Sequence, residues 1–445
     1  MMISEYERQR QENIRRNQEI LASLNIPKLG PPTTLVKKAS TIKREKRETE
    51  EVLPMRKSSR IIEKLTGMKS PEPEIFREVV VKKERRIAPK MNLPYEPRNE
   101  VDDDLKELLR MKSEAKRGSN KYTNLQFQNE RCLVKVAPDR IYSMGMLPVR
   151  DKVVAVAGTK FGSMMFWDAT QVFTGEDVDA LPKVWSFTPH PDESITNIKF
   201  SEGLLYTSAY DGSIKRLNSE YEFETMFESK KKDEWIICGM DVVSGNEFVM
   251  SDVEGRVGLL DWRNKDALVK EWNMKEKKIG CVSMSCDGRQ LALSSNDGTV
   301  SVYDWRNLSP EKALKTFEYG RAVTSVYFHP NSPDYLVSTC YDDHVRVHHL
   351  KDDVVKEARH NNQTGRWITP FKAIWDPKST SADDSRIIVG DMNRGLDIYD
   401  VTGGMLQNIT SDYVTSQPAV SAAHSYHPIV ISGNASGKLV MYYEV

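Results

Sequence analysis

The chain has 445 residues with 64 Lys and Arg against 64 Asp and Glu, so its formal net charge is zero. A chain of this length can hold up to three domains, or one large repeat fold with an additional segment. No stretch approaches the roughly 18 apolar residues of a membrane span. The first residues also lack the apolar run of a secretory signal, so we expect no membrane association.

The charge is divided unevenly along the chain. Residues 1–130 carry 29 Lys and Arg against 21 Asp and Glu, whereas residues 131–445 carry 35 against 43. All eight Trp and all five Cys lie at or beyond residue 132. The first 130 residues are therefore too poor in apolar side chains to form a large core. We expect a basic N-terminal segment followed by an acidic globular domain.

Residues 1–27 are predicted to form an N-terminal helix. The segment 3–24 has no Gly or Pro and is rich in good helix formers. Ser4 and Glu7 have the spacing of a capping box. Its apolar stripe is sparse, so a partner would be needed to steady this helix.

Residues 28–120 are predicted to be a basic and mostly disordered leader. Basic clusters occur at 43–47, 56–60 and 82–86. Two interpretations stay open for these clusters: a merely solvated tail, or a segment for nuclear import and phosphate attraction. Within the leader, residues 101–117 place acidic residues first and basic residues last, which suits a short helix because of its dipole.

The rest of the chain contains an internal repeat. An apolar strand, a turn and a second strand recur seven times, at 153–168, 204–218, 247–263, 291–306, 336–350, 386–400 and 429–443. The residue that opens the second strand recurs at steps of 43 to 50 residues, at Gly162, Gly212, Gly255, Gly298, His344, Arg394 and Gly437. Units of this length cannot bury both faces alone, so neighbours must stack. Four strands per unit are typical of the WD40 β-propeller blade.

We therefore predict an all-β fold, a seven-bladed WD40 β-propeller over residues 121–445. The segment 132–136 is an apolar strand ahead of the first repeat, and the seventh repeat lacks an outer strand. We expect 132–136 to pair with the strand that ends at Tyr443, which closes the ring without an exposed edge.

The strand order of a propeller also assigns the loops to two rims. Loops between the second and third strands share one rim with the loops that lead into the next blade. The basic residues expected on this first rim are Arg140, Lys160, Lys230, Lys231, Lys232, Lys277, Lys278, Arg321 and Arg366. Trp367 and Tyr210 lie in the same loops. Basic loops with aromatic side chains supply phosphate neutralisation and base stacking, although Lys and Arg also favour loops in general.

Catalytic motifs are missing from the sequence. We find no nucleophile elbow, no phosphate-binding Walker loop and no zinc-ligand spacing. We therefore expect a binding protein rather than an enzyme, with no cofactor and no metal site.

Three segments resemble one protein family. They are SEYERQRQENIRRNQEILASL near the N-terminus, VAVAGTKFGSMMFWD and TGRWITPFKAIWDP. They are similar to the WD-repeat DNA damage-binding family of the yeast changed-mutation-rate protein and animal WD repeat-containing protein 76. This family is related to the small subunit of the damaged-DNA-binding complex. The resemblance implies a nuclear protein that binds duplex DNA with a preference for ultraviolet damage, associates with chromatin and acts in DNA metabolism and repair.

The resemblance also implies a role for the segment before the sixth repeat. In the related small subunit, a hairpin at this place inserts an aromatic-bearing tripeptide into the lesion. The matching positions here are Gly365, Arg366 and Trp367, with Gly365 where the relative has its leading aromatic residue.

A second implied feature is an Asp-x-Arg ending of two consecutive repeats. Asp261 with Arg263 and Asp304 with Arg306 are similar to the motif by which WD40 substrate receptors bind the adaptor of cullin–RING ubiquitin ligases. Ordinary packing at the end of a blade is the other interpretation. The motif falls on the rim opposite the basic loops.

Two functions are thus carried forward. The first is a monomeric nuclear protein that binds double-stranded DNA, including damaged DNA. The alternative is a scaffold or ubiquitin-ligase receptor whose partners are proteins such as histones.

Overall fold

The computed structural model describes residues 101–110, 124–175, 181–230, 234–264, 267–379 and 381–444, together with Arg15 and Arg98. The chain divides into two compact units, Met1–Val81 and Lys82–Val445. Only Arg15, in helical conformation, is described in the first unit. The predicted helix at 3–24 and most of the predicted leader therefore lie outside the described residues.

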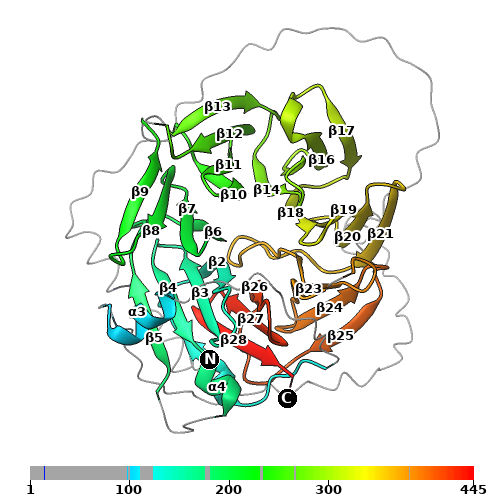
Figure 1. The fold of residues 1–445 in the computed structure, drawn as a ribbon. Coiled ribbons are helices and arrows are strands. Elements are labelled where there is room, and N and C mark those ends of the chain that lie inside the picture. Colours follow the sequence, from blue (N-terminus) through cyan, green and yellow to red (C-terminus); the bar gives the residue numbers. More distant parts are fainter. Residues whose placement is uncertain are drawn as a thin grey trace, which may run out of the picture. The chain divides into compact units, whose positions relative to one another are not determined.

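The second unit contains a ring of seven four-stranded antiparallel sheets (Figure 1). Blade 1 consists of β2 (Ile141–Met146), β3 (Val154–Thr159), β4 (Met164–Asp168) and β5 (Lys183–Phe187). Blade 2 consists of β6 (Ile195–Ser201), β7 (Leu204–Ala209), β8 (Ser213–Leu217) and β9 (Phe223–Glu228). Blade 3 consists of β10 (Ile237–Ser244), β11 (Glu247–Asp252), β12 (Arg256–Asp261) and β13 (Leu268–Asn273). Blade 4 consists of β14 (Ile279–Met284), β15 (Gln290–Ser295), β16 (Thr299–Asp304) and β17 (Ala313–Glu318).

The remaining three blades complete the ring. Blade 5 consists of β18 (Val323–His329), β19 (Ser332–Cys340), β20 (His344–His349) and β21 (Val354–Arg359). Blade 6 consists of β22 (Ile374–Trp375), β23 (Arg386–Gly390), β24 (Leu396–Asp400) and β25 (Met405–Ile409). Blade 7 consists of β26 (Pro418–Ala423), β27 (Ile429–Asn434), β28 (Lys438–Tyr443) and β1 (Leu133–Lys135). The seven-bladed propeller predicted from the repeats is confirmed.

The closure of the ring is confirmed as well. β1 is the outer strand of blade 7 and pairs antiparallel with β28, with Leu133 opposite Val440 and Lys135 opposite Lys438. The segment before β1 extends the contact, because Gln126 exchanges two backbone hydrogen bonds with Tyr443. Strands from the two ends of the propeller segment therefore complete one sheet, and β28 keeps no unpaired edge.

Burial falls from the middle strands of a blade to its outer strand. All six residues of β3 are buried, whereas β17 alternates exposed and half-buried residues. The middle strands are covered on both faces by neighbouring blades, which explains their nearly continuous apolar sequence. Glycine is required at turns such as Gly212, where φ is +75° and an added Cβ would lie 2.3 Å from the carbonyl oxygen of Trp235.

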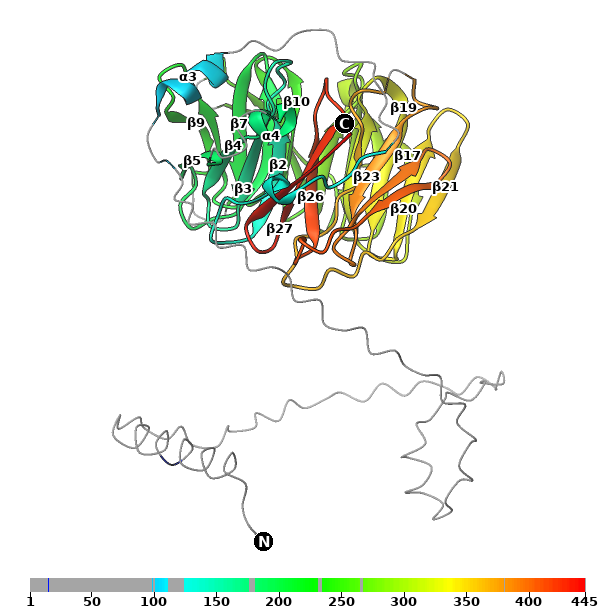
Figure 2. The ribbon, with the colours of Figure 1, turned by 90° about the horizontal axis from the view of Figure 1, so that it is seen from below.

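A short helix, α3 (Asp103–Arg110), packs against the ring and agrees with the helix predicted within 101–117. Leu105 and Leu108 are buried among residues of blades 1 and 2, including Trp185. The indole nitrogen of Trp185 donates to Asp102 at 3.0 Å, and the backbone of Arg98 forms a β-bridge with Trp185. In Figure 2, α3 lies on the rim that also carries the helix α4 (Thr170–Thr174). No pattern in the sequence indicated this packing.

Two short elements remain. Two 3-10 helices, η1 (Glu130–Cys132) and η2 (Trp305–Asn307), adjoin β1 and β16. Among the described residues, no helix is both long and apolar enough to cross a membrane.

Candidate nucleic-acid interface

The strand order places those of the predicted basic residues that the structure describes on one rim. Lys160 lies in the turn between β3 and β4, and the others lie in segments that lead into a blade. These are Arg140 before β2, Lys230 before β10, Lys277 and Lys278 before β14, Arg321 before β18, and Arg366 before β22. We call this edge of the ring the first rim. Lys231 and Lys232 lie outside the described residues.

Most of these cations have no carboxylate partner. Within the described part of the chain, no ion pair engages the side chains of Arg140, Lys160, Lys277, Lys278, Arg321 or Arg366. Carboxylates do occur on this rim, but they accept hydrogen bonds from backbone amides within the turns. Asp211 and Asp297 accept from the backbone amides of Ser213 and Thr299, both at 2.8 Å. Among the described residues, these six side chains therefore present positive charge without an ion-pair partner.

The segment 360–373, between β21 and β22, extends toward the centre of the ring (Figure 1). The hydroxyl of Thr369 donates to the carbonyl oxygen of Ile141 in blade 1 at 2.9 Å. Arg140 donates to the carbonyl oxygen of Arg366 at 3.3 Å, and the Lys160 amide donates to the carbonyl of Arg140. The structure thus brings Arg140, Lys160 and Arg366 together, although they are far apart in sequence.

On the first rim, the charged group of a neighbouring Lys or Arg lies beside each of two exposed aromatic rings. Trp367 is 77% exposed, and the guanidinium of Arg366 lies 5.1 Å from its ring centroid. Phe161 is 52% exposed, with the Lys160 ammonium 4.9 Å from its ring. A side chain that leaves this much apolar surface in water is available to stack on a base. The sequence analysis did not select Phe161, although an aromatic residue in a turn just before Gly162 was a usable signal.

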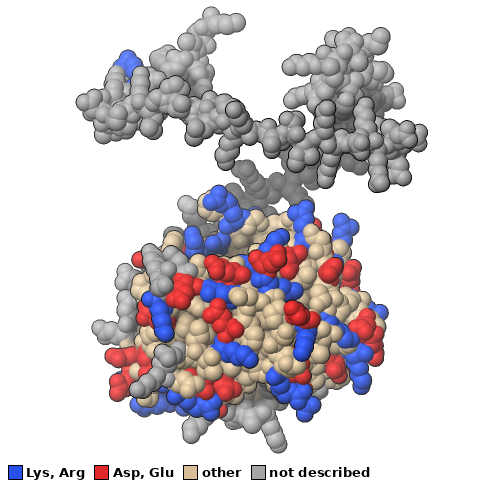
Figure 3. Space-filling view, turned by 90° about the horizontal axis from the view of Figure 1, so that it is seen from above, with Lys and Arg blue, Asp and Glu red and all other residues tan. Residues whose placement is uncertain are grey.

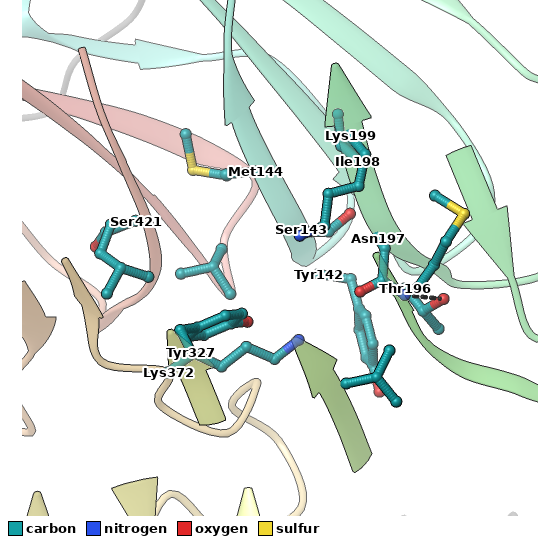
Figure 4. Close-up of a pocket in the computed structure, with 14 residues that line it drawn as sticks. Tyr142, Ser143, Met144, Thr196, Asn197, Ile198, Lys199, Tyr327, Lys372 and Ser421 are labelled. Carbon is teal, nitrogen blue, oxygen red and sulfur yellow. Dashed lines mark hydrogen bonds between the residues drawn. The ribbon is translucent and has the colours of Figure 1, made fainter. Parts of the chain in front are cut away.

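A cavity of about 150 Å³ lies in the channel at the centre of the ring (Figure 4). Inner-strand residues such as Tyr142, Asn197 and Tyr327 line it, together with Lys372 from the segment just before β22. Figure 4 shows the Lys372 side chain extending into this space toward Tyr142. Within the described residues, the Lys372 ammonium has no acidic partner. Burial, together with the charges of Lys278 and Lys199, lowers the pKa of Lys372.

Two tyrosines connect this channel to the basic loops. The hydroxyls of Tyr142 and Tyr210 lie 2.8 Å apart, and Lys278 donates to Tyr210 at 3.2 Å. Burial raises the pKa of Tyr210 to about 12, so its hydroxyl keeps its proton at neutral pH. The mouth of the channel on the first rim is therefore rich in hydrogen-bond donors. The sequence analysis did not select Tyr142 or Lys372, because nothing in their spacing indicated which side chains face the channel.

The outer edge of the ring differs from the first rim. Figure 3 shows Lys and Arg interspersed with Asp and Glu over the edge that it displays. Paired examples on outer strands include Arg346 of β20 with Glu357 of β21 at 2.8 Å. Such mixed charge does not favour a polyanion.

The rim opposite the basic loops carries the two Asp-x-Arg pairs. The guanidinium of Arg263 donates twice to Asp261, both at 2.8 Å, and once to Glu247 at 2.9 Å. Arg306 donates twice to Asp304, both at 3.2 Å. The hydrogen bonds from Arg263 lower the pKa of Asp261. The two arginine side chains are 61% and 71% exposed, so a partner protein could contact both.

Comparison with known proteins gives two results. The family described as "WD domain, G-beta repeat" matches residues 268–304 and 311–349, which span β13–β16 and β17–β20. DNA damage-binding protein CMR1 of Phaeosphaeria nodorum is 28% identical over 99% of this chain and 98% of its own length. DNA damage-binding protein cmr1 of Neurospora crassa is 27% identical over 99% of this chain and 98% of its own. WD repeat-containing protein 76 of Xenopus laevis is 26% identical over 99% of this chain and 80% of its own length.

The chain is therefore similar to these proteins and contains WD repeats. The similarity covers nearly the whole chain, so it includes the N-terminal residues as well as the propeller. The family resemblance inferred from the three sequence segments is confirmed.

Proposed function

We propose that this chain is a nuclear, non-catalytic protein that binds duplex DNA through the first rim and prefers DNA with ultraviolet damage. The observation that carries the proposal is the group of Lys and Arg side chains around one mouth of the channel that have no ion-pair partner among the described residues. Two exposed aromatic rings lie among them, each beside the charged group of a neighbouring Lys or Arg. The names of the homologues agree with this function.

The chemistry of this rim suits the DNA backbone. Separated Lys and Arg on different loops can contact phosphates on both strands without reading the sequence. Each phosphate that is neutralised releases counterions, so the affinity should fall steeply with salt. Arg366 can contact phosphate or enter the minor groove, while Trp367 can stack on an unstacked base.

A preference for damage follows from the position of Trp367. Its ring is exposed and lies on a segment that is anchored through Thr369 and Arg366 to blade 1. Damaged base pairs cost less to unstack than intact pairs, so an aromatic side chain at this place would favour a lesion. The φ of Gly365 is +63°, which the turn before Arg366 requires and which Gly adopts without strain.

The direct test is a titration of the full chain with intact and ultraviolet-irradiated duplexes of one sequence at several salt concentrations. We expect binding to both, tighter binding to the irradiated duplex, and a linear fall of log affinity with log salt. No measurable affinity for either duplex near physiological salt would refute the proposal. Equal affinity for both would leave duplex binding and remove the preference.

The receptor function is the second candidate, because Arg263 and Arg306 are exposed on the rim opposite the DNA-binding one. Replacing both with Ala should leave folding and DNA affinity nearly unchanged, because surface substitutions usually change stability by less than about 0.5 kcal/mol. Recovery of a cullin–RING adaptor with the full chain should then fall sharply. Unchanged recovery would assign these residues to packing alone. Histones are further candidate partners for the same chain, which we expect to act as a monomer.

A further inference from the structure

The first-rim end of blade 6 contains three convergent donors that the DNA-binding function does not use. They are His360 in the segment before β22, Asp391 just after β23, and Asp397 in β24. Their ligand atoms lie within 4.8 Å of one another, and the three residues are 4%, 7% and 4% exposed. Among the described residues, this is the one such group of His, Cys, Asp and Glu.

The histidine is oriented for ligation. Its Nδ1 lies 2.7 Å from the amide oxygen of Asn362, an acceptor, so Nδ1 carries the proton and Nε2 presents a lone pair. The Nε2 atom is buried without a hydrogen-bond partner and lies 3.6 Å from Asp397. A hydrogen bond that fixes the tautomer and the ring direction is the usual support of a metal-ligating histidine.

Asp397 is held in a similar way. The amide of Asn408 donates to one carboxylate oxygen, and the hydroxyl of Tyr399 donates to the other at 3.3 Å. No contact neutralises the Asp391 carboxylate within the described residues.

Within the described residues, no Lys or Arg pairs with these two buried carboxylates. Burial of an unpaired ion is costly, so the group must take up protons or a cation. A divalent ion would balance both carboxylates at once, and it would use the Nε2 lone pair that has no other partner.

Blade 2 shows what the same fold does with a histidine that needs no ion. His190, in the segment before β6, lies 2.7 Å from Asp211 through Nδ1 and 2.9 Å from Thr207 through Nε2. Both ring nitrogens therefore have partners. Ser213 lies 3.0 Å from Nδ1 as well.

The repeat alignment shows how blade 6 departs from blade 2. With Gly212 aligned to Arg394, the partners Thr207, Asp211 and Ser213 correspond to Val389, Asn393 and Gly395. Val389 and Gly395 have no polar side-chain atom that could meet an imidazole. The same alignment replaces Ala209 and Lys215 with Asp391 and Asp397. Blade 6 has thus lost the hydroxyl partners of its histidine and gained two carboxylates.

We propose that His360, Asp391 and Asp397 form a binding site for one divalent transition-metal ion, which ties the segment before β22 to β23 and β24. One imidazole nitrogen from His360 and carboxylate oxygens from Asp391 and Asp397 form a set of ligands that suits zinc or manganese. The ion would fix the start of the segment that carries Arg366 and Trp367.

The test uses the full chain and zinc as the probe. After purification without chelator, elemental analysis should find about one zinc or manganese per chain. Added zinc at about 100 times its dissociation constant should raise the melting temperature by roughly 3–5 °C over chelator-treated protein. Cobalt in place of zinc should give visible absorption bands typical of nitrogen and oxygen ligands.

Two variants and a control complete the design. His360→Gln and Asp397→Asn should abolish the metal content, the cobalt bands and the thermal shift. His190→Gln, in the metal-free cluster of blade 2, should lower the melting temperature but keep all three signals. If the wild-type chain shows neither cobalt bands nor a thermal shift with zinc, the proposal is wrong. This result needs no variant to fold, and it is independent of the DNA titration.

Discussion

The exposed Arg263 and Arg306 on one rim and the exposed Arg366 on the other are in opposite states. On the rim of the Asp-x-Arg pairs, Arg263 donates to Asp261 and Glu247, and Arg306 donates to Asp304. On the first rim, Arg366 contacts the Trp367 ring and has no carboxylate partner within the described residues. A pair formed within three residues neutralises its own charge and contributes little to stability when it is exposed.

The difference shows how one fold can offer two kinds of surface. The Asp-x-Arg pairs present nearly neutral, geometrically fixed guanidinium groups, which suit a protein partner with matching acceptors. The first rim presents unneutralised cations beside exposed aromatic rings, which suit a polyanion with stackable bases. For binding to a polyanion, the number of Lys and Arg side chains without a carboxylate partner is therefore more informative than the total number of Lys and Arg.

The largest effect should come from a deletion that damages both rims at once. Removing residues 1–140 deletes β1 and exposes β28, so we expect aggregation of the product. Removing residues 1–81, the first compact unit, should give a soluble monomer. Size-exclusion chromatography with light scattering checks both. A soluble, monomeric product of the longer deletion would contradict the closure by β1.

Removing residues 1–120 is an informative intermediate. This deletion leaves β1 in place but removes α3, whose Leu105 and Leu108 are buried against blades 1 and 2. We expect lower stability than that of the shorter deletion, without the aggregation caused by the open sheet edge.

Acid should weaken the blades beneath both rims. Burial lowers the pKa of His348 to about 3 and that of His424 to about 4. Both stay neutral in the folded chain, whereas the unfolded chain protonates them below about pH 6.5. Their contribution is therefore complete above pH 6.5 and is lost as the pH falls toward 4. From these two groups we expect a decrease of about 2–3 kcal/mol in the free energy of unfolding between pH 7.5 and 5.5.

Urea unfolding at a series of pH values checks this decrease. The matched variant is His424→Gln, because His424 accepts amide hydrogen bonds from Tyr426 and His427 through Nδ1. The variant should be less stable at pH 7.5 and should lose less on acidification. An unchanged pH slope would show that His424 does not contribute to it.

Trp367→Ala tests whether the exposed ring on the first rim is responsible for the preference for damaged DNA. Base stacking on an aromatic side chain contributes about 1–3 kcal/mol, so we expect the preference for irradiated duplex to fall while intact duplex binding is weakened less. Phe161→Ala is the comparison variant, because Phe161 is also exposed beside a cation but lies in the β3–β4 turn of blade 1 and not in the segment 360–373. If Trp367→Ala weakens both duplexes by the same factor, Trp367 is not the residue that senses damage.

The smallest expected effect concerns single charges on opposite rims. Lys277 on the first rim and Lys312 on the other rim are both exposed. Lys277→Ala should reduce the salt slope by about one and weaken intact and irradiated duplexes equally. Lys312→Ala should change neither. Equal slopes for the two variants would show that the rims are not distinguished by DNA.

The sequence by itself determined the seven blades, the closing strand and the rim of each loop. Apolar runs that alternate with turn residues set the strands, and an unpaired outer strand requires a partner, so 132–136 had only one place to pair. The rim of Arg366 or Arg263 then followed from strand order alone. These features depend on local pattern and on backbone pairing, which the chain specifies position by position.

Only the tertiary structure decided which side chains meet. The sequence analysis expected no metal site, because His360, Asp391 and Asp397 have no ligand spacing, and their convergence depends on the path of the segment 360–373. The approach of Arg140 to Arg366 and the entry of Lys372 into the channel depend on the same path. A loop follows the shape of the blades that it crosses rather than a periodic pattern of its own, so such contacts are fixed by packing between distant residues.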